Sequence, residues 1–151
     1  MHYITKNPKN TEGYQKMVQS CKYFFLKNPI LIIFGLNYSQ TGWTASIKNG
    51  YKNIDKNTIL CKLWITDTIR VYRDNIINGT FDSSIIPKIY RCAVKYLSLY
   101  EQIISLNEFT FLCSSAERLT LEEVTVKNDD GIEVAFENLI KKLPQLKGIV
   151  L

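Results

Sequence analysis

The chain has 151 residues, of which 46% are hydrophobic, and it carries a net charge of +5. This length and composition suit one ordinary globular domain whose stability needs no metal or cofactor. The longest apolar run, residues 29–36, is far shorter than the roughly 20 residues that span a bilayer, and no basic, apolar leader follows Met1. From these features we expect neither a membrane-spanning helix nor a secretion signal, and we expect a cytoplasmic or nuclear protein.

The basic charge balance makes an acidic partner or a nucleic acid worth considering. Lys and Arg are scattered along the chain, however, and Lys141-Lys142 is the only adjacent basic pair, so a solvated lysine surface explains the charge. The cysteines form no C-x-x-C pair, and His2 is the only histidine. The sequence therefore predicts no metal site and buried, reduced thiols at Cys21, Cys61, Cys92 and Cys113.

The N-terminal part begins with a polar tail, residues 1–13, followed by an amphipathic segment that Pro29 ends. Between residues 14 and 27 apolar side chains recur every three or four positions, which predicts a helix. Its apolar face would hold Tyr14, Met17, Val18, Cys21, Phe24 and Phe25.

Strands and turns dominate the middle of the chain. Residues 30–36 are a β-branched run typical of a buried strand, and residues 43–47 alternate in polarity before a turn signal at Asn49-Gly50. Residues 59–72 are rich in strand formers, and residues 75–84 are expected to form an exposed loop.

The C-terminal part alternates strands and helices. A strand is expected at residues 93–99, and Ser105 is expected to cap a helix that starts near Leu106, with Glu108 completing a capping box. A strand at 116–126 and a turn at 128–131 follow, and a second helix ends at Pro144 after an apolar stripe formed by Val134, Phe136, Leu139, Ile140 and Leu143. The last strand, residues 149–151, would leave an edge that invites pairing with a partner.

Three short segments in this part share an alternating pattern, Tyr96-Leu97-Ser98-Leu99, Arg118-Leu119-Thr120-Leu121 and Gly148-Ile149-Val150-Leu151. Their spacings, from Leu97 to Leu119 and from Leu119 to Ile149, straddle the roughly 20 to 29 residues of a leucine-rich repeat. A fourth candidate, residues 62–65, precedes them at a wider spacing. The asparagine or cysteine that follows the strand in regular repeats is missing, since Tyr100 and Glu122 follow instead. The alternative is an α/β domain whose strands merely look alike.

Hydrophobic spacings and turn residues recur in segments 87–90, 96–99, 107–112, 124–131 and 139–146. Together these segments resemble a large lineage of nematode F-box-associated proteins, whose C-terminal halves are degenerate leucine-rich repeats. Upstream, residues 14–25 are similar to the tail of the F-box in that lineage. The resemblance implies an α/β fold in two parts: a tail and helix left from an F-box (1–29), and a short leucine-rich-repeat-like solenoid of parallel strands and return helices (30–151).

In that family the F-box docks on the Skp-type adaptor of a cullin–RING ubiquitin ligase, while the repeats hold the protein substrate. The Leu-Pro element and first apolar helix of a complete F-box are absent here. If the remaining helix contacts the adaptor, the resemblance implies that Met17, Val18, Cys21, Phe24 and Phe25 do so; alternatively, this helix caps the first strand of the repeats.

In a stacked array the strands line the concave face, so the outward residues of these strands are expected to contact the partner. These candidates are Tyr96, Ser98, Tyr100, Arg118, Thr120 and Glu122, and Tyr and Arg often concentrate binding energy.

A catalytic site is not expected. The paired acids Glu122-Glu123 and Asp129-Asp130 are better explained as solvated strand and turn residues, and His2 is too isolated for a Ser-His-Asp arrangement. The sequence therefore predicts a non-enzymatic protein-interaction module. The alternatives are a basic nucleic-acid-binding module and an enzyme with a deep pocket of convergent polar groups.

Overall fold

The computed structural model describes residues 10–20, 26–27, 29–72 and 79–151, which form a mixed α/β fold with one large sheet and few helices. The strands, from β1 to β10, are Ile30–Ser39, Gly42–Ile47, Gly50–Ile54, Lys62–Val71, Ile89–Cys92, Tyr96–Tyr100, Ile103–Ser105, Arg118–Glu122, Thr125–Lys127 and Gly148–Val150. The helices are α2 (Thr11–Ser20), the 3₁₀ helix η1 (Ser83–Lys88), α4 (Leu106–Leu112) and α5 (Phe136–Lys141). The predicted α/β class is confirmed.

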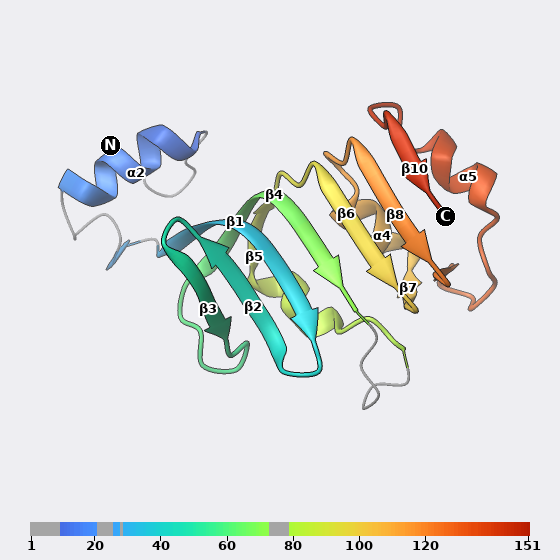
Figure 1. Cartoon of the computed structure of the whole chain (residues 1–151), viewed down its shortest axis with the longest axis horizontal. Coiled ribbons are helices and arrows are strands. Elements are labelled where there is room, and N and C mark those ends of the chain that lie inside the picture. Colours follow the sequence, from blue (N-terminus) through green and yellow to red (C-terminus); the bar gives the residue numbers. More distant parts are fainter. Residues whose placement is uncertain (1–9, 21–25, 28, 73–78) are drawn as a thin grey trace.

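The large sheet has the strand order β10-β8-β6-β4-β1-β2-β3, with β5 paired to β4 off this path (Figure 1). Strands β1, β4, β6, β8 and β10 pair in parallel, whereas β2 and β3 extend the sheet from β1 as antiparallel strands. Parallel neighbours need crossover connections, and η1, α4 and α5 lie in the crossovers that separate β4, β6, β8 and β10. A second, two-stranded parallel sheet joins β7 to β9.

The hydrophobic core lies on the face of the large sheet that η1 and α4 cover (Figure 1). Ile69, Leu97 and Leu119 on three adjacent parallel strands are almost completely buried and pack in one cluster with Phe109 and Leu112 of α4. Because successive strand residues point to opposite faces, every second side chain of these strands faces away from the core. The opposite face of β4, β6, β8 and β10 is called the open face below.

The segment of β4 that aligns with the later parallel strands differs from the one expected from the sequence. Ile69 of β4, Leu97, Leu119 and Ile149 are successive partners across the four strands. Within β4 it is thus residues 68–71 that align with β6, β8 and β10, whereas residues 62–65, the fourth candidate segment, pair with β1 and β5. The spacing before Leu97 is shorter than predicted, since it runs from Ile69 and not from Leu63.

Two predicted strands are divided in the structure. The strand expected at 93–99 becomes β5 and β6, separated by residues 93–95. The strand expected at 116–126 becomes β8 and β9, because Glu123 adopts a positive φ of 51° that interrupts extended backbone. Glu101, at the equivalent place just after β6, has nearly the same φ of 50°.

The capping box at Ser105 and Glu108 is confirmed at the start of α4. The loop expected at 75–84 lies partly outside the described residues, and its remainder is not an exposed loop, because Phe81 is 3% exposed and η1 begins at Ser83. The last helix is shorter than its apolar stripe: α5 ends at Lys141, while Leu143 is still buried beyond it.

Helix α2 begins at Thr11, inside the segment expected to be a polar tail. Asn10 explains the earlier start, since its side chain accepts a 2.6 Å hydrogen bond from the Gly13 N–H and so satisfies a free donor of the first turn. Tyr14 is 3% exposed and packs with Ile30 and Trp64, and its hydroxyl accepts a hydrogen bond from the Ile30 N–H at 3.1 Å.

The other residues predicted on this helix are not tested by the structure. Met17 and Val18 lie on α2, but their side chains are outside the described part, and Cys21, Phe24 and Phe25 lie outside the described residues altogether. Cys92 and Cys113 are buried as predicted, whereas Cys61 is partly exposed and Cys21 is not described. Within the described residues, no helix is long and apolar enough to cross a membrane.

Candidate binding face

The open face carries two rows of side chains that run across the strands. The first row follows the partners Thr68, Tyr96, Arg118 and Gly148, and the second follows Arg70, Ser98, Thr120 and Val150. Both rows continue across β1, β2 and β3, the first through Gly35, Ser46 and Tyr51 and the second through Asn37, Thr44 and Asn53. Hydroxyl, amide and guanidinium groups therefore prevail on this face.

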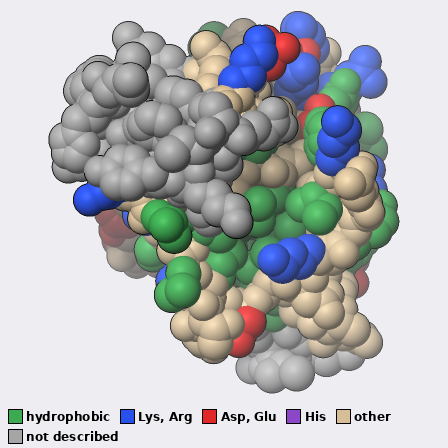
Figure 2. Space-filling model, turned by 90° about the vertical axis from the view of Figure 1, so that its left-hand side faces the viewer, with side chains coloured by type: hydrophobic (Ala, Val, Ile, Leu, Met, Phe, Trp, Pro, Cys, Tyr) green, Lys and Arg blue, Asp and Glu red, His purple; other side chains and the backbone are tan. Residues whose placement is uncertain are grey.

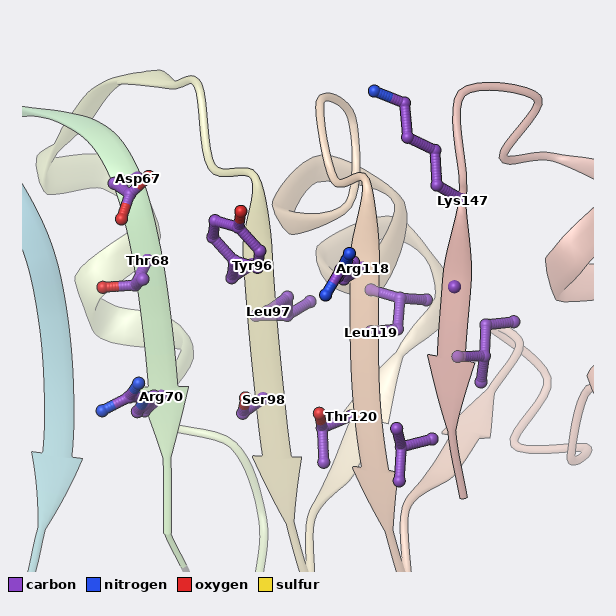
Figure 3. A pocket seen from close by; sticks show the side chains of 13 residues that line it. Asp67, Thr68, Arg70, Tyr96, Leu97, Ser98, Arg118, Leu119, Thr120 and Lys147 are labelled. Carbon is purple, nitrogen blue, oxygen red and sulfur yellow. The ribbon is translucent and has the colours of Figure 1, made fainter.

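A shallow groove of about 710 Å³ lies over these rows and is lined by residues of β4, β6, β8 and β10. Figure 3 shows Arg70, Tyr96 and Arg118 projecting from three neighbouring strands, on the face opposite the helices that are drawn behind the sheet. Tyr96 is 43% exposed and Arg118 and Arg70 are exposed, so these side chains are accessible to a ligand.

Four charged residues lie at one end of these rows, directly before β6, β8 and β10 and inside β4, and they are called the rim below. The Lys95 N–H donates to the Asp67 carbonyl, the Glu117 N–H to the Lys95 carbonyl, and the Lys147 N–H to the Glu117 carbonyl, at 2.8, 2.9 and 2.7 Å. The sign of the charge alternates along the rim. Lys147 Nζ lies 2.7 Å from Glu117 Oε2, and this hydrogen bond, with the nearby charges of Lys147, Lys95 and Arg118, lowers the pKa of Glu117.

At the other end of the strands an aromatic pair borders the rows. The rings of Tyr72 and Tyr100 stack with a centroid distance of 5.0 Å and an interplanar angle of 6°. Glu122 is the strand partner of Tyr100 and is exposed. The groove is thus bounded by the rim at one end and by two tyrosines and a carboxylate at the other.

The structure brings all six predicted contact residues onto the open face. Tyr96, Arg118 and Glu122 are exposed, and Ser98, Tyr100 and Thr120 are partly buried. Their contact with a partner stays a prediction, since the structure contains none. Sequence reasoning missed Thr68 and Arg70, although the Thr-Ile-Arg-Val pattern at 68–71 has the same alternation as strands β6 and β8.

Sequence reasoning also missed a buried amide behind the face. Gln102 is 2% exposed, and its Nε2 donates a 3.0 Å hydrogen bond to the carbonyl of Tyr100. In the leucine-rich pattern the polar residue stands three positions after the second strand leucine, which is Gln102 when counted from Leu99. The sequence-based expectation looked for that residue at Tyr100, two positions earlier.

A second, more apolar depression of about 410 Å³ lies beside β3, and its lining includes Leu31, Ile54, Ile59 and Leu60. Figure 2 looks at the end of the molecule that carries β3, where hydrophobic side chains gather on the surface. Leu60 is 93% exposed there. Among the described residues, no cluster of His, Cys, Asp or Glu could hold a metal ion.

No protein-family model, curated protein or solved structure matches the chain. The chain is a mixed α/β protein with a large sheet, one face of which carries a shallow polar groove.

Proposed function

We propose that this chain is a non-enzymatic protein-interaction module that binds a protein partner through the open face. The observation that carries the proposal is the pair of rows on β4, β6, β8 and β10, where Tyr96, Arg70 and Arg118 project over a groove among small hydroxyl side chains. Rigid aromatic and guanidinium groups supply binding energy at protein interfaces, and hydroxyl groups supply adaptable hydrogen bonds.

Within this proposal the parallel strands form a short leucine-rich-repeat-like array. Buried Val94, Leu97, Leu99 and Ile104 fit the repeat pattern, with Gln102 in the polar position. The same spacing recurs in the next unit of the chain, where Ala116, Leu119, Leu121 and Val126 are also buried. The parallel pairing of β7 with β9 supports a second ladder behind the first, as expected for stacked repeats.

By resemblance, the module corresponds to the substrate-recognition part of an F-box ubiquitin-ligase adaptor, acting in the cytoplasm or nucleus. The proposal leaves two roles for the N-terminal helix. The burial of Tyr14 against Ile30 and Trp64 supports a helix that covers the start of the sheet. Contact with a Skp-type adaptor would fall to Met17, Val18, Cys21, Phe24 and Phe25.

A basic nucleic-acid-binding module is the alternative, favoured by the exposed Arg70, Arg118 and Tyr96 on one face. Binding of that kind weakens steeply as salt rises, because each neutralised phosphate releases counterions. The salt dependence of partner binding therefore separates the two functions.

The test is a pull-down from an extract of the source organism with residues 1–151 as bait, read by mass spectrometry and by probes for the Skp-type adaptor and cullin. The variant Tyr96→Ala/Arg118→Ala should keep the wild-type melting curve and lose a specific protein partner. The control Lys141→Ala/Lys142→Ala, on exposed positions of α5 and its C-terminal end, should retain that partner. A partner set that is identical for all three baits would refute binding through the open face.

A further inference from the structure

The charges of the open face are not balanced in its central part. Neither the first row nor the second row contains an Asp or Glu on any strand that it crosses, from β3 at one edge of the large sheet to β10 at the other. Each row contains one arginine, Arg118 in the first and Arg70 in the second. Within the part of the chain that the structure describes, neither guanidinium makes a hydrogen bond or a close ion pair.

The rim does not share this imbalance. Asp67 and Glu117 alternate with Lys95 and Lys147 along equivalent backbone positions, and the Lys147–Glu117 pair closes at 2.7 Å. Two acids and two bases cancel each other at this end of the groove. The positive charge available to a ligand is therefore concentrated in the two arginines, while exposed Glu122 lies beyond them at the opposite end.

We infer that the open face takes an extended acidic segment of a protein partner, with two carboxylate side chains directed at Arg70 and Arg118. This inference rests on the proposed function and specifies the chemistry of the partner. Arginine presents a planar fork of donors that matches a carboxylate in two parallel hydrogen bonds. Ser98, Thr120 and Thr68 lie between and beside the two guanidiniums, where their hydroxyls can bond a peptide backbone (Figure 3).

The strand geometry sets the spacing of the two carboxylates. Arg70 and Arg118 stand two strands apart and one row apart, which places their Cα atoms roughly 12 Å from each other for strands about 4.8 Å apart. An extended segment advances about 13 Å over four residues. Acidic side chains four positions apart on one side of the segment therefore match the two arginines.

A nucleic acid fits this face less well. Single-stranded nucleic acids are bound by a groove that follows the backbone with many cations and by aromatic rings that stack on successive bases. Here the lysines of the rim alternate with acids, Lys147 is paired with Glu117, and Tyr72 and Tyr100 stack on each other.

The inference is tested by fluorescence anisotropy with the full chain and three synthetic probes. These are a short serine-rich peptide with two glutamates four positions apart, the same peptide with both glutamates replaced by glutamine, and single-stranded polyuridine RNA. The acidic peptide should bind about tenfold more tightly than the glutamine peptide, because only the former forms charge-assisted pairs with arginine. Its affinity should fall moderately as salt screens these exposed charges.

The protein variants locate the effect. Arg70→Gln and Arg118→Gln should each weaken binding of the acidic peptide, and the double variant should reduce it to the level of the glutamine peptide. Lys141→Gln/Lys142→Gln removes the same charge from an exposed site on and beside α5 and should leave the affinity unchanged. Superimposable thermal melts exclude unfolding as the cause.

Two results overturn the inference: equal affinities for the two peptides, or RNA that binds more tightly than the acidic peptide. Each is distinguishable from failure of the proposed function. If the extract still yields a protein that depends on Tyr96 and Arg118 while both peptides bind alike, the function stands and the acidic chemistry is wrong. If capture from the extract does not depend on the open face, the function itself fails.

Discussion

The indole N–H of Trp43 on β2 donates a 3.0 Å hydrogen bond to Oδ2 of Asp82, which lies far downstream in the chain. Lys56 Nζ lies 2.7 Å from the same oxygen, and Ser84 donates to Oδ1. The carboxylate thus joins the β2–β3 hairpin, the segment after it and the start of η1. Burial alone would raise the pKa of Asp82, but the hydrogen bonds from Lys56, Ser84 and Trp43 and the charge of Lys56 lower it.

We expect Asp82→Asn to destabilise the fold by about 1 to 3 kcal/mol at neutral pH, because a part-buried cluster of charge-assisted hydrogen bonds is lost. Since the folded-state pKa lies below the unfolded value, the carboxylate contributes its stability above the unfolded pKa and loses it as pH falls through the folded pKa. Urea unfolding should show that the difference in the free energy of unfolding between the wild type and Asp82→Asn is constant near neutral pH and disappears in acid. Glu137→Gln, at an exposed position of α5, serves as the control. A stability difference between the wild type and Asp82→Asn that persists in acid would contradict this role of the carboxylate.

Gly35 on β1 leaves room for a neighbouring side chain on the open face. A Cβ at this position would meet the Oγ1 atom of Thr68 at 2.5 Å, which is too close for an unrelieved contact. We expect Gly35→Ala to destabilise the protein by about 1 to 3 kcal/mol, as overpacking usually does. The double variant Gly35→Ala/Thr68→Ala should recover most of this loss in thermal melts, because the clashing atom is removed. If the destabilisations of the two single variants simply add in the double variant, the side chain at position 35 does not contact Thr68.

The local features of the fold were accessible from the sequence because they depend on neighbouring residues. The capping box at Ser105 and Glu108 uses a spacing of three along one helix, and the alternation at Leu97 and Leu119 reports directly which side chains are buried. The predicted contact residues lie on one face for the same reason: side chains of a strand alternate between its two faces, so the buried leucines also identify the residues that point outward.

The features that were missed depend on pairing between distant segments. The register of β4 is set by a shift in its pairing with β1, where Ile33 pairs with Ile65 but Gly35 pairs with Thr68. No local pattern marks that irregularity, so Arg70 was not placed on the open face. The roles of Asp82 and Gly35 likewise follow from contacts with Trp43 and Thr68, which are remote from them in the sequence.

Glu123 provides a test of the backbone break between β8 and β9. An L-residue in the left-handed region costs roughly 1 to 2 kcal/mol, while glycine adopts that region freely at a cost of about 0.5 to 1 kcal/mol in unfolded-chain entropy. We expect Glu123→Gly, where φ is 51°, to leave the melting temperature unchanged or raise it by a few degrees. Glu122→Gly, one residue earlier in extended β8, should lower it. Equal losses in both variants would contradict a left-handed residue at this break.

The thiols offer a test of core packing. Burial raises the pKa of Cys92 to about 11, and burial together with the nearby Cys92 thiol raises the pKa of Cys113 further. Cys61 is only partly buried, and its pKa is raised chiefly by that burial. Because thiolates are the reactive form, iodoacetamide at pH 8 should modify Cys61 of the native protein well before Cys92 or Cys113.

Peptide mapping by mass spectrometry follows each cysteine separately, and the same reaction in urea provides the control, where all three should react at similar rates. Raising the pH of the native protein should speed the labelling of Cys61. Cys92 should stay protected, because a closed core keeps the reagent away from both its thiol and its thiolate. Comparable labelling of Cys92 and Cys61 at pH 8 would mean that the layer between the sheet and α4 opens readily in solution.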